Sequence, residues 1–188
     1  MGAHGHEADG GCECDGLTMR GKHYLVFDTI ANANAQRRKL SEALNFPPTL
    51  AFSHSLLKPE IPRSSVLAEA LPANVKLLTL TNNYKDISGG KVLLRLAHLY
   101  SVGEHPTLSQ PVIISLAELF KLAGHHITAA EEMSLTANQL ATTMDAMHNA
   151  GGRWTSDAVA PRNRLNPKDE KLQVTIKPME VRTFLVTL

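Results

Sequence analysis

Alternation of apolar and polar residues predicts several short β-strands along the chain. In the segment GKHYLVFD, for example, His23, Leu25 and Phe27 share one face of the expected strand. Gly, Pro, Asn and Asp residues that favour turns separate the candidate strands. These strands cover residues 21–28, 49–57, 75–81, 91–100, 111–116, 126–136 and 171–188, the last interrupted by Pro178.

A helical pattern is convincing only in residues 33–45. Leu40, Ala43 and Leu44 recur there at helical spacing, within a run of residues that favour helix. The proline pair that begins at Pro47 cannot continue a helix. We therefore expect one amphipathic helix near the start of the chain.

Short strands outnumber helices, which indicates the fold class. Residues 117–120 suggest a single helical turn, and the ambiguous segment 138–152 ends at a glycine pair. Residues 75–81 and 91–100 are joined by a short turn-rich segment and predict a hairpin or adjacent strands. The apolar run VLLRLA indicates burial on both faces. We predict an all-β fold: an antiparallel β-sandwich with one helix near residues 33–45 and short helical turns.

Composition places the chain among ordinary globular proteins. It has 188 residues, 43% hydrophobic and 20% charged, and a net charge of +1. No long basic block or basic–aromatic pattern indicates nucleic-acid binding, and no apolar run approaches the ~18 residues of a membrane span. Residues 1–15 are polar and Gly-rich without the apolar core of a signal peptide, so we expect a flexible N-terminal segment followed by one domain, 16–188.

The histidines and cysteines raise the question of a metal site. His4 and His6 precede Cys12 and Cys14, but the C-x-C spacing differs from the C-x₂₋₄-C of structural zinc sites, and a flexible tail is the favoured interpretation. The redox state of the two cysteines stays open. The pair His98 and His105, like the adjacent pair His125 and His126, has the wrong spacing to converge on a metal from a strand face, so structural roles are favoured.

Arg95 is unusual because it lies among leucines. A buried charge needs a carboxylate or several carbonyl partners, and we expect a pair across the sheet with Glu180 or Asp28. The alternative is an arginine that contacts a ligand. We assign structural roles to Arg95, His98 and Glu180, and no catalytic, cofactor-binding or metal-binding role to any residue.

Motifs of known enzyme classes are absent from the sequence. There is no GxSxG, HExxH, P-loop or GxGxxG. Glu131 and Glu132 are adjacent, so on a strand they point to opposite faces and cannot converge as two catalytic carboxylates. The residue chemistry alone therefore predicts a β-sandwich with no visible active site.

Several segments, in order along the chain, resemble the C-terminal region of class II α-mannosidases, glycoside hydrolase family 38, and most closely its lysosomal branch. The most specific are RLAH…VGE and PMEVRTFL. The resemblance runs from about residue 16 to the end. The matching segments cover residues 16–28, 71–83, 92–105, 108–120, 131–139, 153–154 and 176–185.

This resemblance implies a multidomain parent enzyme. An N-terminal barrel of that family holds zinc and the aspartate nucleophile, followed by a helical bundle and β-sandwich domains. The family's His-x-Asp zinc motif has no counterpart here, and its DDxRGxGE segment would lie just before Gly16, where this chain has AHGHEADGG. The parent would remove terminal α-D-mannose from oligosaccharides and glycoproteins in a lysosome or acidic vacuole. The partners implied are the upstream catalytic and helical domains, and the isolated chain should be inactive.

Two alternatives remain, an autonomous carbohydrate-binding sandwich and an interaction module. Sugar-binding modules usually expose aromatic platforms. The one tryptophan, Trp154, stands beside Arg153 and is more typical of a strand anchor.

Overall fold

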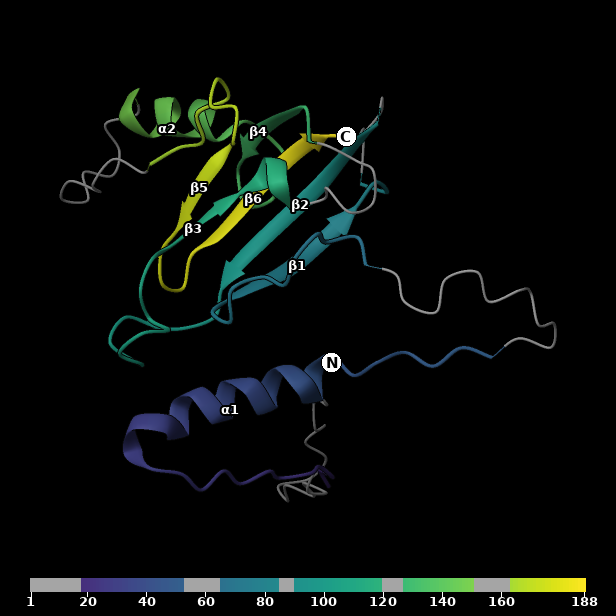
Figure 1. Cartoon of the computed structure of the whole chain (residues 1–188), viewed down its shortest axis with the longest axis vertical. Helices are drawn as coiled ribbons and strands as arrows, with labels where there is room; N and C mark the ends of the chain where they lie inside the picture. The colour runs from purple at the N-terminus through teal and green to yellow at the C-terminus, as the bar shows by residue number, and fades with distance from the viewer. Residues whose placement is uncertain (1–17, 53–64, 85–89, 120–126, 151–162) are drawn as a thin grey trace, which may run out of the picture.

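The computed structural model describes residues 18–52, 65–84, 90–119, 127–150 and 163–188. Figure 1 shows helix α1 apart from the strands, which run next to one another in the rest of the described chain. The elements in chain order are α1 (Ile30–Asn45), β1 (Val75–Thr81), β2 (Lys91–His98), β3 (Val112–Ser115), the 3-10 turn η1 (Leu116–Glu118), β4 (Ala129–Met133), α2 (Ala141–Ala150), β5 (Gln173–Ile176) and β6 (Val181–Thr187).

The strands form two antiparallel sheets. Four of them lie in the order β1-β2-β6-β4, and the other two, β3 and β5, pair with each other. Strands β1 and β2 are direct neighbours, as the sequence predicts, and β5 and β6 flank Pro178. The predicted antiparallel, mostly β fold is confirmed.

One apolar core lies between the two sheets. Each fully buried Leu, Ile, Val or Phe contributes about 1.5–3 kcal/mol by leaving water. Leu93, on the opposite face of β2 from Leu94, is also fully buried, so the predicted burial of this strand on both faces is confirmed. The large core side chains that are fully buried are Leu94 and Leu96 of β2, Leu116 of η1, Val174 and Ile176 of β5, and Phe184 and Val186 of β6.

The predicted helix is present and starts three residues earlier than expected. It ends at Asn45, where the Phe46 amide donates to the Glu42 carbonyl oxygen and Pro47 follows. The predicted helical turn is η1. The ambiguous segment 138–152 contains a second helix, α2, so the expectation of a single helix is wrong.

The strand predicted at residues 21–28 is also wrong. Figure 1 draws this segment as a stretched-out trace, but it pairs with no described strand, and most of its side chains are exposed. Residues 49–52 form no strand either, and the rest of that candidate, 53–57, lies outside the described residues. Alternation gives a strand its two faces, but the hydrogen bonds of its backbone amides and carbonyls need a neighbouring strand.

Candidate functional site

His98, at the end of β2, is buried and fully surrounded by polar groups of this chain. Its Nε2 lies 3.0 Å from the Gln110 carbonyl oxygen and 3.2 Å from Asn74 Nδ2. Its Nδ1 accepts a hydrogen bond from the Tyr100 amide at 3.2 Å. Both ring nitrogens thus lie within hydrogen-bonding distance of described groups of this chain, and the structural role of His98 stays a prediction.

Glu104 joins α1 to the loop between β2 and β3. Gly103, with φ of 71°, makes the turn that brings Glu104 back to accept from the Ser101 amide at 2.8 Å. The Arg38 guanidinium donates to both carboxylate oxygens, from Nε at 2.7 and 2.9 Å and from Nη2 at 2.7 Å, and Arg37 adds a contact at 3.3 Å. The Arg38 hydrogen bonds lower the pKa of Glu104 to about 2.

Arg182 of β6 and Glu132 of β4 form a buried ion pair at the edge of the core. Arg182 Nη2 lies 2.6 Å from Glu132 Oε2, and their side chains are only 3% and 8% exposed. Arg182 Nη1 also donates to the Thr175 carbonyl oxygen of β5 at 2.8 Å, so this side chain connects the two sheets.

The same carboxylate holds the segment that follows residue 162. Glu132 accepts from Arg164 Nη1 at 2.9 Å and from the Leu165 amide at 2.9 Å, and Arg164 continues to Asp145 of α2. Burial alone would raise the pKa of the Glu132 carboxyl, but hydrogen bonds from Arg182 and the Leu165 amide outweigh it and keep that pKa below its ordinary value. Sequence reasoning missed this network.

A detectable signal for it did exist in β6. Arg182 shares one face of β6 with Phe184 and Val186, whose side chains are fully buried. The expectation that a charge among apolar residues needs a carboxylate partner, which we applied to Arg95, applied equally to Arg182. Arg95 itself is half-buried. Its Nε donates to the Leu135 carbonyl oxygen at 3.3 Å.

The ion pair predicted between Arg95 and Glu180 or Asp28 is wrong. Within the described ranges Arg95 makes neither contact; its guanidinium carbon lies 5.9 Å from the centre of the Tyr84 ring. The register places Arg95 opposite Thr183, and Glu180 instead accepts from the Lys177 amide at 2.9 Å. A ring face and a carbonyl oxygen suffice because the guanidinium still reaches water.

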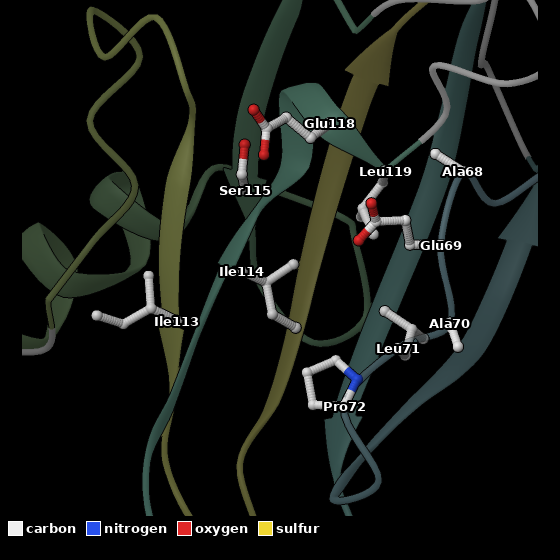
Figure 2. A pocket seen from close by; sticks show the side chains of 10 residues that line it. All are labelled: Ala68, Glu69, Ala70, Leu71, Pro72, Ile113, Ile114, Ser115, Glu118 and Leu119. Carbon is white, nitrogen blue, oxygen red and sulfur yellow. The ribbon is translucent and has the colours of Figure 1, made fainter.

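A hollow of about 340 Å³ lies beside β3 and η1. Figure 2 shows the two segments that line it, residues 68–72 and 113–119, on opposite sides. Its described lining combines apolar side chains with the carboxylates of Glu69 and Glu118 and contains no aromatic ring. It therefore lacks the stacking platform that sugar-binding modules use.

Metal ligands do not converge in the part of the chain that the structure describes. No group of three or more His, Cys, Asp or Glu residues there could hold a metal ion. His4, His6, Cys12 and Cys14 lie outside the described residues, as do Trp154 and the pair His125 and His126. The described residues therefore do not fit zinc. Among them, no helix is long and apolar enough to cross a membrane.

Comparison with known proteins relates the chain to one enzyme family. A probable alpha-mannosidase of Arabidopsis thaliana is 35% identical over 190 residues, covering 94% of this chain and 18% of that protein. The lysosomal alpha-mannosidase of Homo sapiens is 32% identical over 181 residues, covering 92% of this chain and 17% of that protein. An alpha-mannosidase of Canavalia ensiformis is 32% identical over 187 residues, covering 92% and 18%. The chain thus spans less than a fifth of the length of these relatives.

The family model for the glycosyl hydrolases family 38 C-terminal beta sandwich domain matches residues 74–184. This range begins one residue before β1 and ends within β6, so it contains strands β1 to β5, the first part of β6 and most of the core residues. Because the match covers more than half of the chain, this protein belongs to the family of glycosyl hydrolase family 38 C-terminal β-sandwich domains, as its sequence motifs imply.

Proposed function

We propose that this chain is the non-catalytic C-terminal domain of a zinc-dependent, retaining α-mannosidase. The parent would hydrolyse terminal α-D-mannose residues of oligosaccharides and glycoproteins. The observation that carries the proposal is the family match over residues 74–184, together with relatives named alpha-mannosidase that are about five times as long as this chain. The catalytic and helical domains, with the zinc ion, would belong to the remaining length.

The chemistry of the described carboxylates supports a non-catalytic role. A retaining glycosidase needs two carboxyl groups ~5 Å apart, one of them a general acid with a raised pKa. The two best-buried carboxylates, Glu104 and Glu132, have lowered pKa values because arginines bind them. The arginines favour the ionised form of both carboxyls, which suits an ion pair better than a general acid.

An acidic compartment is compatible with these ion pairs. Relatives named lysosomal alpha-mannosidase support a lysosome or acidic vacuole for the parent. With a pKa of about 2, Glu104 stays ionised at pH 4–5, so its contact with Arg38 would persist there. The attachment of α1 to the loop between β2 and β3 would therefore persist at the pH of that compartment.

Turnover of an aryl α-mannoside tests the proposal. The purified 188-residue chain should release no product between pH 4 and 7 with zinc added, while the human lysosomal alpha-mannosidase, run in parallel, does. Zinc-dependent turnover by the chain alone would refute a non-catalytic role. Calorimetric titration with mannose separates the alternative, because binding to the isolated chain would identify an autonomous carbohydrate-binding module.

A further inference from the structure

Large apolar side chains are exposed throughout residues 18–52, which we call the docking segment. Ile30, Phe27 and Phe52 are 98%, 90% and 94% exposed. Soluble proteins rarely leave so much contiguous apolar surface in water unless another surface covers it. The exposed apolar residues of the docking segment are Met19, Tyr24, Leu25, Phe27, Ile30, Leu44, Phe46, Leu50 and Phe52.

Within the docking segment, residues 21–28 have the form of a strand without a sheet. Figure 1 draws them as a stretched-out trace, and all of their side chains are exposed except that of Val26, which is partly buried. No backbone hydrogen bond joins them to any other described residue. Figure 1 draws this stretch (dark purple) well away from both sheets. Unpaired amides and carbonyls in an extended segment are the complement of an open sheet edge.

Helix α1, the other part of the docking segment, is attached to the sandwich by polar contacts. None of its residues is buried. Its described links include the Arg37 and Arg38 contacts with Glu104 and an ion pair of Glu42 with Lys76. Arg38 also donates to Ser101 Oγ at 3.3 Å and lies over the Tyr100 ring. Without shared apolar core, the docking segment is an attachment to the sandwich and not a layer of it.

The comparisons point to where the covering surface lies. The family model of the sandwich begins at residue 74, beyond the docking segment. The match to the Arabidopsis thaliana relative covers 94% of the chain, so it must include most of residues 18–52. The docking segment is therefore shared with the long enzymes but lies outside the sandwich domain, which favours a contact with another part of the long polypeptide.

We propose that residues 21–28 add as a β-strand to the edge of a sheet in the portion of the α-mannosidase polypeptide that this chain does not span. Leu25 and Phe27 would pack on the apolar face of that sheet. This inference rests on the proposed function and goes further, because it moves the start of the sandwich domain from residue 16 to between residues 52 and 65. The chain would then carry the last strand of the preceding domain.

Hydrogen–deuterium exchange tests this assignment. In the 188-residue chain, the amides of residues 21–28 should exchange at the rate of an unstructured peptide while those of β2 and β6 are protected. In the intact Arabidopsis thaliana relative, the aligned peptide should exchange at least 100-fold more slowly. Fast exchange in both proteins would overturn the proposal, and so would protection in the dilute isolated chain. Protection that grows with the chain's concentration would assign the strand to a second copy and refute this occupant.

Substitutions provide a second readout. Leu25→Asp with Phe27→Asp should leave the Tm of the 188-residue chain within 1 °C, as should the control Val102→Asp, whose side chain is 84% exposed in the β2–β3 loop. In a chimera in which this chain replaces the matching part of the relative, only the double variant should lower the secreted yield, by at least fivefold. Equal yields of the double variant and the control would overturn the proposed strand addition of residues 21–28. The mannoside assay is independent of both readouts. If the isolated chain were inactive but its residues 21–28 were protected, the proposed strand addition would be refuted and the proposed function would stand.

Discussion

The buried carboxylate of Glu132 offers the sharpest test of what holds this fold together. Its two oxygens accept hydrogen bonds from Arg182, Arg164 and the Leu165 amide, and only 8% of its side chain is exposed. Glu132→Gln keeps the size and shape of the side chain but removes its charge. Arg182, 3% exposed, would then keep one carbonyl partner and lose its counter-ion.

The expected loss of stability is large. Breaking a buried ion pair by neutralising one partner costs about 3–5 kcal/mol, because the other charge stays buried without compensation. In a chain of this size each kcal/mol corresponds to roughly 2–4 °C, so the Tm should fall by roughly 6–20 °C. The low accessibility of both side chains places the pair at the upper end of ion-pair effects.

Glu131→Gln is the matched control in the adjacent position. Glu131 lies on the solvent side of β4, 3.5 Å from Lys91, with both side chains near half exposure. An exposed pair of this kind contributes about 0–1 kcal/mol. Urea unfolding of the three proteins at pH 7 measures the difference. If the two variants lost the same free energy within about 0.5 kcal/mol, a value well inside the spread expected between exposed and buried pairs, the buried network would not be a major source of stability.

The pH dependence of the same variant provides an internal check. The pKa of Glu132 is lower in the folded than in the unfolded state, so its contribution is complete above the ordinary value of 4.5 and is lost as pH falls through the lowered value. The stability deficit of Glu132→Gln should therefore shrink below pH 4.5. A deficit that stayed constant into strong acid would point to lost packing and not to lost charge.

Three further changes probe other parts of the chain. Glu104→Gln should speed hydrogen exchange in α1 at least fivefold without altering β2 and β6, and wild-type α1 should keep its protection until pH falls from 4.5 toward 2. Arg95→Ala should lower the free energy of unfolding by about 1 kcal/mol or less, since one 3.3 Å hydrogen bond to Leu135 and a ring contact are lost; a larger drop in urea unfolding would reveal a missed partner. Phe184→Ala should cost about 3–5 kcal/mol, because the side chain is fully buried in the core, and a loss under 1 kcal/mol would contradict that burial.

Local patterns predicted the elements whose partners are close in sequence. β1 and β2 pair across a short connection, so alternation and turn residues contain nearly all the information on this pair. The helix near residues 33–45 follows from its spacing and the proline that ends it. Fold class follows from the same evidence, because successive side chains of a strand point to opposite faces and a sequence rich in strands therefore shows a period of two.

The ion-pair partners could not be predicted in this way. Glu132 and Arg182 are separated by 50 positions and meet only because β4 and β6 are neighbours in the larger sheet. Arg95 drew attention because leucines surround it in sequence, yet its side chain reaches the surface. The pattern marks which positions face a core, but the choice of partner depends on strand order, and strand order is a tertiary property.

Residues 21–28 also show that a local pattern does not identify the pairing partner of a strand. Their alternation is that of a strand, yet they pair with none of the described strands of either sheet. A sequence records the interactions of the whole polypeptide, so a segment whose partner lies elsewhere keeps its strand pattern while its apolar side chains stay exposed. The contrast with β6 is informative. Phe184 alternates in the same manner and is fully buried, because β2 and β4 flank its strand. Phe27 differs in having no neighbouring strand among the described residues, and under our proposal the part of the parent polypeptide that this chain does not span supplies that neighbour.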